Sequence, residues 1–445
     1  MLNFKLVTNQ QSLIIIKFPL SRKQQNKFVM KIFKFGGASV KDANGVKNLV
    51  KVLQDVGYNN TLIVVSAMGK TTNAIEVVIK NYFDESPELQ ASIQEIAKYH
   101  NEILLELFPN ENHPIFAKVK TFFEEMKGFL GRNKSPDYNY VYDQLVSFGE
   151  LISTTIVSAY LNSISVENTW LDVREMIKTD TNYRDAKVDW QLTKEKITQK
   201  VNRNKLHITQ GFIGSDPNNF TTTLGREGSD YTAAIFAYCL NAESVTIWKD
   251  VPGVLNADPR YFENAQLLHN ISYREAIELA FYGASVIHPK TLQPLQRKEI
   301  PLYVKSFLNP KEDGTAVAKG SGIKPNIPCF IVKKNQVLIS LSSLDFSFIV
   351  EENISEIFKL LHDCKMKVDV IQNSAISFSV CVDNKFNNLE KLLNTLRSKF
   401  KVIHYENVSL YTIRHFTESA IEGLQKEKEI LLEQRAEQTI QLVVK

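Results

Sequence analysis

The stretch KFGGASV, residues 34–40, decides the fold of this chain. A mostly apolar run, 29–33, precedes it, and a polar–apolar pattern typical of a helix follows it. A strand that ends in two glycines and then enters a helix brings backbone N–H groups close to a phosphate, because glycine has no Cβ to keep the ligand away. Lys34 places a flexible positive charge beside them. The stretch therefore indicates a phosphate site, although strand–Gly–Gly turns also occur in proteins without one.

Two further elements place this turn in a parallel sheet. Residues 42–56 carry apolar side chains at helical spacing, and Thr61 to Val65 is a nearly continuous apolar run, typical of a strand buried on both faces. A polar loop, 66–73, follows that strand, and open α/β sheets bind ligands at such carboxyl ends. The loop is not a P-loop, because that motif needs a glycine where Val64 stands. The alternation of strands and helices predicts an α/β fold.

Two later segments carry charges suited to an amino-acid ligand. Glu150 is expected near the start of a helix, so it either binds a ligand or only complements the helix dipole, and the sequence favours neither reading. Arg226 stands in a glycine-flanked loop, where its planar guanidinium is able to clamp a carboxylate. Ser229 is expected to cap the following helix, with Asp230 in its first turn.

Composition excludes several classes of protein. The chain has 445 residues, which predicts two or three domains, and its formal net charge of +4 without a basic, aromatic-rich block argues against nucleic-acid binding. Its four cysteines lie far apart, which argues against a zinc site or disulfide framework and predicts a cytoplasmic location. The apolar run 12–16 is too short to cross a membrane, and residues 1–29 are expected to be a disordered extension.

Six motifs, in order, resemble those of aspartate kinase, in the amino-acid kinase superfamily. They are KFGGASV (34–40), VVSAMGKTTN (64–73), SFGE (147–150), TLGREGSDYTAA (223–234), IWKDVPGVLNADPR (247–260) and YGASVIHP (282–289). The resemblance implies an amino-acid kinase domain over 30–310, with a mainly parallel sheet between helices. It also implies an enzyme that transfers the γ-phosphoryl group of ATP, with Mg²⁺ carried by ATP, to the side-chain carboxylate of L-aspartate, opening lysine, threonine and methionine biosynthesis.

The same resemblance assigns roles to individual residues. Lys34 and Asp230 are implied as catalytic. Aspartate is expected to be held by Ser66, Thr72, Glu150, Arg226 and Ser229. The nucleotide is expected at Lys34, Gly36, Gly37, Ser39, Lys249, Asp250, Arg260, Ser285 and Val286, and no metal site formed by the protein is expected.

The chain departs from the family pattern at a few positions in these motifs. Ala38 stands where many relatives have Thr, and Glu227 where they have Gly. In the nucleotide loop, Lys249 and Leu255 replace Thr and Tyr, and Ser285 replaces a common Lys. The phosphoryl-transfer residues themselves are intact.

The last third has a different pattern. Its predicted strands and helices follow the order βαββαβ, which resembles an α+β regulatory ACT domain over 335–407, joined to the kinase domain by a linker, 311–334, and followed by a shortened second ACT domain, 408–445. In this family such domains bind a feedback amino acid and build a homodimer or larger homo-oligomer. A dimerisation module without ligand, a kinase for another carboxylate, and an amino-acid sensor with a silent kinase domain are the alternatives. Residues 348–353 replace the expected glycine-containing loop, so the effector is not predicted.

Overall fold

The computed structural model describes residues 29–284, 287–320, 322–345, 347–426 and 428–445. The predicted extension, apart from its last residue, lies outside the described residues. The nucleotide-site candidates Ser285 and Val286 lie outside them as well.

The predicted α/β fold is confirmed by the large sheet. Among the described residues it holds nine strands in the order β11-β8-β10-β9-β7-β1-β2-β4-β3, and the run from β9 to β3 is parallel throughout. The strands are β1 (Lys31–Phe35), β2 (Thr61–Val65), β3 (Thr169–Leu171), β4 (His207–Gln210), β7 (Ser244–Lys249), β8 (Asn270–Ser272), β9 (Leu302–Ser306), β10 (Thr315–Ala318) and β11 (Ile323–Lys324). A separate hairpin joins β5 (Ile213–Ser215) to β6 (Thr221–Thr223).

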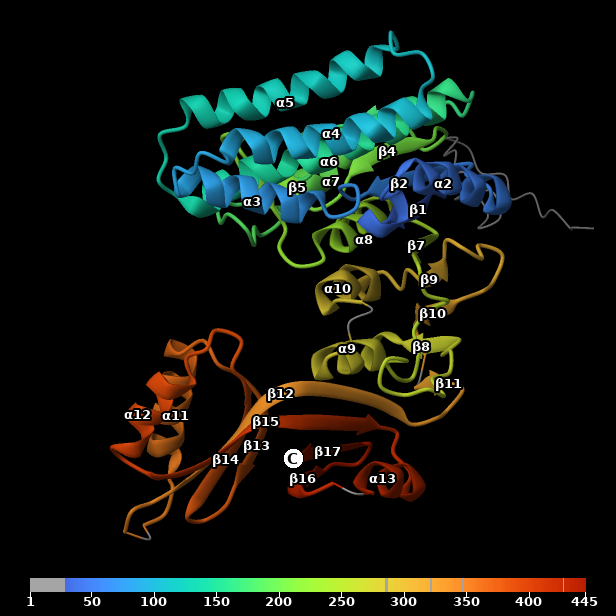
Figure 1. Cartoon of the computed structure of the whole chain (residues 1–445). Helices are drawn as coiled ribbons and strands as arrows, with labels where there is room; N and C mark the ends of the chain where they lie inside the picture. The colour runs from blue at the N-terminus through green and yellow to red at the C-terminus, as the bar shows by residue number, and fades with distance from the viewer. Residues whose placement is uncertain (1–28, 285–286, 321, 346, 427) are drawn as a thin grey trace, which may run out of the picture.

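Helices cover both faces of this sheet (Figure 1). One core packs α2 to α6 against β1 and β2, and a second packs α7 to α10 against the opposite face. The helices are η2 (Gly37–Val40), α2 (Ala43–Val56), α3 (Thr71–Phe83), α4 (Leu89–Leu107), α5 (Pro114–Arg132), α6 (Tyr138–Ser163), η3 (Val173–Glu175), α7 (Trp190–Lys200), α8 (Gly228–Leu240), α9 (Tyr273–Tyr282) and α10 (Pro289–Arg297).

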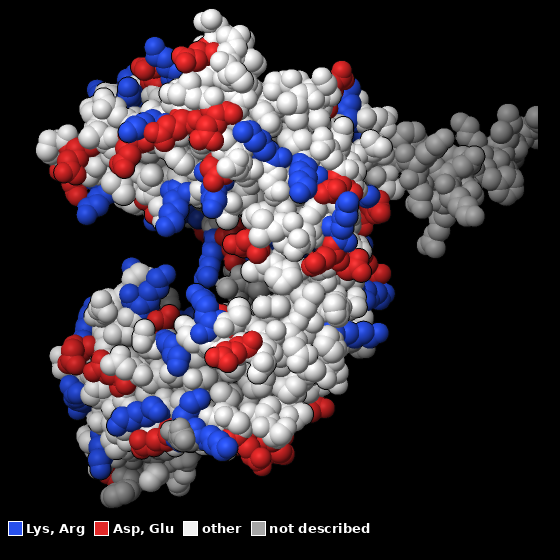
Figure 2. All heavy atoms as spheres, turned by 45° about the vertical axis from the view of Figure 1, so that its right-hand side comes forward, with Lys and Arg blue, Asp and Glu red and all other residues white. Residues whose placement is uncertain are grey.

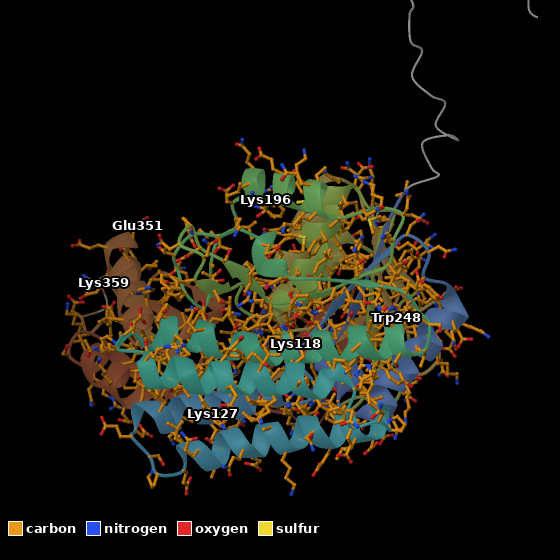
Figure 3. All side chains as sticks on the ribbon, turned by 90° about the horizontal axis from the view of Figure 1, so that it is seen from above. Lys118, Lys127, Lys196, Trp248, Glu351 and Lys359 are labelled. Atoms are coloured by element: carbon orange, nitrogen blue, oxygen red, sulfur yellow. The ribbon has the colours of Figure 1, made fainter. Side chains whose placement is uncertain are left out.

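The alternation of side chains along β1 aims Lys34 at one helix. Phe33 and Phe35 lie on the face that carries the first core. Their rings pack against that of Trp248, which is labelled in Figure 3, at centroid distances of 5.7 and 6.0 Å. Because neighbouring side chains on a strand point to opposite faces, Ile32 and Lys34 lie on the other face, against which α8 packs. The strand thus directs the Lys34 ammonium towards α8.

The C-terminal region forms one antiparallel sheet below the part that holds the large sheet (Figure 1). Among the described residues its order is β13-β14-β12-β15-β17-β16. Helices α11 and α12 pack on its first half, where the order βαββαβ is the predicted one. The elements are β12 (Cys329–Ser342), α11 (Glu351–Asp363), β13 (Lys367–Asn373), β14 (Ser377–Asp383), α12 (Leu389–Arg397), β15 (Lys401–Arg414), α13 (Glu418–Gln425), β16 (Ile430–Arg435) and β17 (Thr439–Val444).

Three strands lie within or begin in the stretch expected as a linker, 311–334. β10 and β11 belong to the large sheet, and the first part of β12 pairs with residues 410–414 of β15. The second half of the C-terminal sheet therefore takes one strand from before the first half, which no local pattern in the sequence indicates. Residues 401–414, which the expected boundary between 407 and 408 divides, form one long strand.

Two expectations about helix starts are wrong. Glu150 lies in the middle of α6, which begins twelve residues earlier at Tyr138, so it does not complement the dipole of a helix start. Ser229 is the second residue of α8, and the N-cap position is taken by Glu227, whose side chain makes no capping hydrogen bond. Neither side chain therefore serves a helix start, by complementing its dipole or by capping it.

Candidate active site

The carboxyl ends of β1, β2 and β7 meet at one edge of the large sheet, where a cavity of about 540 Å³ lies. Its walls come from the ends of these strands, from α6, and from the loop that leads into α8. Parallel strands place all their carboxyl ends at the same edge, so loops far apart in sequence converge there. Figure 2 shows a deep hollow between the helix-rich part and the C-terminal sheet, with Lys and Arg side chains gathered towards its inner end.

Lys34 and Asp230 form the charged centre of the cavity. Lys34 Nζ lies 2.7 Å from Asp230 Oδ1, and both side chains are nearly buried, with 11% and 4% of their surface exposed. The strand alternation described above brings the lysine to α8, and Asp230 lies in the first turn of that helix. The carboxylate thus fixes the position of an ammonium group that faces the cavity.

The glycine turn packs tightly against the loop that follows β2. Gly69 N donates to Gly37 O (3.0 Å), and Ser66 N donates to Phe35 O (3.0 Å). A Cβ on Gly37 would lie 2.7 Å from Ala67 O and 2.8 Å from Gly69 O, closer than Cβ atoms approach backbone oxygens. Only glycine therefore fits at this position.

Glu150 reaches the cavity from the middle of α6. Its residue surface is 3% exposed, and Glu150 Oε2 accepts no hydrogen bond from the described residues. Burial raises the pKa of Glu150 to about 8, although the Ala67 N–H and the positive charge of Lys34 act in the opposite direction. A cationic ligand group beside it would favour its ionised form.

The loop before α8 carries Arg226 in an exposed position at the cavity wall. Gly225 has φ 79° and Glu227 has φ 53°, so the chain turns twice through the left-handed region on either side of the arginine. Glu227 Oε2 is buried without a hydrogen-bond partner among the described residues. Gly228 and Ser229, at the start of α8, also line the cavity, and the N-terminal end of a helix favours negative charge.

The cavity gathers most of the residues predicted for the site. It is lined by Lys34, Gly37, Ser66, Thr72, Glu150, Arg226, Ser229, Asp230 and Lys249. Four other predicted residues do not line it: Gly36, Ser39, Asp250 and Arg260. Of these, Gly36 lies directly beside the cavity, since a Cβ there would be 3.3 Å from Lys34 Nζ, whereas Ser39 is buried. Arg260 is exposed and pairs with Asp258 Oδ2 at 2.6 Å.

Several cavity residues were not predicted. They are Ala67, Gly69, Tyr142, Arg184, Phe212, Thr223, Gly225, Glu227 and Gly228. Most lie inside the sequence motifs quoted above, so the motifs located them without assigning them a role. Tyr142, Arg184 and Phe212 lie outside every motif, so no motif indicated them. They come from α6, from the loop between η3 and α7, and from the turn between β4 and β5.

Metal ligands and membrane spans were searched for in the same structure. Within the described ranges, no three His, Cys, Asp or Glu side chains come together where they could hold a metal ion. None of the helices described has the length and apolar character needed to cross a membrane.

Comparison with known proteins gives consistent results along most of the chain. A family model described as the amino acid kinase family matches residues 30–306. Lysine-sensitive aspartokinase 3 of Escherichia coli (strain K12) is 34% identical over 349 residues, which cover 77% of this chain and 76% of that protein. A bifunctional aspartokinase/homoserine dehydrogenase of Buchnera aphidicola is 32% identical over 65% of this chain, and the match spans 36% of that protein.

Solved structures agree with the fold of both regions. The crystal structure of E. coli aspartokinase III in complex with lysine and aspartate, in its T-state, has a TM-score of 0.78 and 29% identity. The match covers 93% of this chain and 96% of that one. The R-state structure of the same protein, with aspartate and ADP, has a TM-score of 0.76 and 28% identity over the same shares of the two chains.

Proposed function

The chain belongs to the aspartokinases of the amino acid kinase family, and we propose on this basis that its cavity transfers the γ-phosphoryl group of MgATP to the side-chain carboxylate of L-aspartate. The product is 4-phospho-L-aspartate. One observation carries the proposal more than any other: the ammonium of Lys34, held 2.7 Å from Asp230, lies in the same cavity as Glu150 and Arg226.

The protein itself takes little part in the covalent chemistry of this reaction. A carboxylate acceptor is ionised at neutral pH, so no general base is needed, and catalysis consists of positioning and of neutralising charge on the phosphoryl oxygens. Lys34 supplies a positive charge at the transferring group, and Asp230 holds that ammonium in place. Gly37 lets the backbone approach the phosphates closely. The Mg²⁺ that accompanies ATP enters as part of the substrate.

The acceptor is held by groups of opposite charge. Aspartate carries two carboxylates and one ammonium. Glu150, with an unpartnered buried oxygen, suits the ammonium, and Arg226 suits a carboxylate through its bidentate guanidinium. Ser66, Thr72 and Ser229 line the same space and offer hydroxyl groups. Lys249, at the carboxyl end of β7, is assigned to the nucleotide.

A trapping assay tests the assignment. Purified protein is incubated with MgATP and aspartate, glutamate or no acceptor, and hydroxylamine converts any acyl phosphate to a hydroxamate. Hydroxamate from aspartate alone is expected. Product from glutamate in its place would assign a different acceptor, and no product with any acceptor would leave only a sensing role for the chain.

We extend the proposal to the regulatory sheet. The similar E. coli structure holds lysine as well as aspartate, and the C-terminal sheet of this chain is proposed to bind an amino acid effector and to pair with a second copy of the chain. Sedimentation velocity with and without lysine, threonine or methionine, alongside the trapping assay, tests both parts. If the protein is a monomer and none of the three amino acids changes its rate of hydroxamate formation, both parts of the proposal are contradicted.

A further inference from the structure

Arg184 is a charged residue of the cavity that neither the sequence motifs nor the family resemblance assigned. It lies in the loop between η3 and α7 with φ 70°, in the left-handed region. A residue with a side chain other than Asn or Asp is uncommon there and costs about 1 kcal/mol or more. Such a conformation persists only when surrounding contacts impose it. Strained residues of this kind cluster at functional sites, where the strained backbone positions a side chain that the site uses.

Buried hydrogen bonds impose this conformation. Arg184 N donates to Asp143 Oδ2 at 3.0 Å, and Asp143 is fully buried on α6. The same carboxylate accepts from Thr223 N and Thr223 Oγ1, both at 2.8 Å. Asp143 therefore ties the Arg184 loop to α6 and to the end of β6. The backbone at Arg184 is fixed independently of what its side chain does.

Aromatic rings hold the side chain at the cavity. The Arg184 guanidinium lies 4.2 Å from the centroid of the Tyr142 ring and 5.8 Å from that of Tyr138. The Tyr142 hydroxyl donates to Glu76 Oε1 at 3.0 Å, which fixes the ring. No described carboxylate forms an ion pair with Arg184. A guanidinium stacked on a ring keeps its N–H edge available for an oxyanion.

Arg184 lies close to Arg226. A Cβ on Gly225 would be 2.6 Å from Asp185 Oδ1 and 3.4 Å from Arg184 O, so the 184–185 backbone packs directly against the loop that carries Arg226. Both arginines line the cavity, as does Thr223, which shares the Asp143 carboxylate with Arg184 N. Two arginines from directly packed loops thus line the same cavity.

We propose that Arg184 is a specificity-determining residue that binds a carboxylate oxygen of the acceptor amino acid together with Arg226. The proposal rests on the proposed function, because it concerns the acceptor of that reaction. An acceptor with two carboxylates gains from two guanidinium groups, and one with a single carboxylate leaves one of them without an anion. The ligand group is an oxyanion in either case. It comes from the acceptor carboxylate in this proposal, and a phosphate of the nucleotide is the other source.

The test compares Arg184→Asn with the wild type and with Arg132→Asn, an exposed arginine at the end of α5. Asn tolerates the left-handed region, so the variant is expected to keep its melting temperature. Isothermal titration calorimetry is expected to show aspartate Kd raised about tenfold or more. The KM for aspartate rises with it, the KM for MgATP stays within about twofold, and Arg184→Lys is intermediate. Arg132→Asn behaves as the wild type.

The outcomes separate the alternatives. Unchanged aspartate Kd in Arg184→Asn overturns the proposal, and so does a rise confined to the KM for MgATP, which would place the guanidinium at a phosphate. Calorimetry needs no turnover. If the wild type binds aspartate but yields no hydroxamate, the proposed function is wrong, and the calorimetric comparison still tests the role of Arg184. A wild type that binds no aspartate overturns both.

A second pair of variants tests the aromatic support. Tyr142→Phe keeps the ring and loses the hydrogen bond to Glu76, whereas Tyr142→Leu removes the ring beneath the guanidinium. Aspartate binding is expected to weaken in Tyr142→Leu and to change less than about twofold in Tyr142→Phe. Equal effects of the two substitutions would contradict a guanidinium held by the ring.

Discussion

Lys34 and Lys31 lie three residues apart on β1 and form a matched pair for testing the catalytic role of Lys34. Lys34 pairs with Asp230 in the site, and Lys31 lines a different cavity. Lys34→Ala is expected to lower kcat by about 10²–10³-fold or more, because the charge that faces the transferring phosphoryl group is lost. Lys31→Ala is expected to retain the wild-type rate. Hydroxamate formation measures both, and circular dichroism checks the fold.

A loss of the same size in both variants would instead point to a general effect on β1. Near-normal turnover in Lys34→Ala would remove Lys34 from the mechanism.

Glu150 makes the stability of the ligand-free protein depend on pH. Burial raises its pKa from 4.5 to about 8. Below pH 4.5 the carboxyl is protonated in both the folded and unfolded states, but between about 4.5 and 8 only the folded state holds the proton. The free energy of unfolding attributable to Glu150 therefore falls as pH rises through this window. Urea unfolding at several pH values is expected to show a shallower decline in Glu150→Gln than in the wild type.

Asp143, whose pKa burial raises to about 6, titrates in both proteins and cancels in that comparison. If the two pH profiles run parallel from pH 4.5 to 8, Glu150 is not the group that titrates. Proton release offers an independent check, because an ammonium beside Glu150 favours its ionised form. Aspartate binding near pH 7 is expected to release a proton in the wild type and none in Glu150→Gln, measured by calorimetry in buffers of different ionisation enthalpy.

At the scale of elements, the site depends on how closely two loops approach. Gly37→Ala places a methyl group against Ala67 O and Gly69 O, so the glycine turn and the loop after β2 must separate. We expect a stability loss of about 1–3 kcal/mol and a large loss of kcat. Gly131→Ala, near the end of α5 with no atom within 4 Å of its Cβ position, is the control. It is expected to keep full activity and to gain up to about 1 kcal/mol.

Urea unfolding and the trapping assay measure both variants. Full activity in Gly37→Ala would show that the contact between the two loops is not needed for the reaction.

The sequence predicted those elements whose pattern is local. The run TLIVV at 61–65 is a buried strand and the glycines at 36–37 form the turn after β1, because burial and backbone freedom follow from the residue types themselves. Glu150 was misplaced relative to its helix because the start signal of α6, Asp137, which caps the helix through its side chain, was not used. Arg184 was missed because its position depends on a hydrogen bond to Asp143, 41 residues away, which no local pattern encodes.

At the scale of the whole molecule, a buried ion pair joins the regulatory sheet to the kinase domain. Arg414, at the end of β15, donates through Nε and Nη2 to the two oxygens of Glu275 on α9, at 3.0 and 2.7 Å. Burial alone would raise the pKa of Glu275, but the bonds from Arg414 and its charge outweigh it and hold the pKa below its ordinary value. Helix α9 packs against α10, where Lys290 Nζ donates to Leu224 O at 2.8 Å. One continuous run of packed elements thus connects the regulatory sheet to the loop that carries Arg226.

Removing one partner of this ion pair is expected to lower the free energy of unfolding more than removing both partners. Arg414→Met leaves the Glu275 carboxylate buried, with His415 Nε2 at 3.1 Å, and is expected to lower the free energy of unfolding by about 3–5 kcal/mol. Arg414→Met combined with Glu275→Leu leaves no buried charge uncompensated, so the double variant is expected to be more stable than Arg414→Met alone. Urea unfolding of the two single variants and the double variant measures the coupling. Additive effects would show that the pair does not couple the two regions, and any regulatory signal would then have to cross the interface through apolar contacts such as the stacked rings of Phe262 and Phe330.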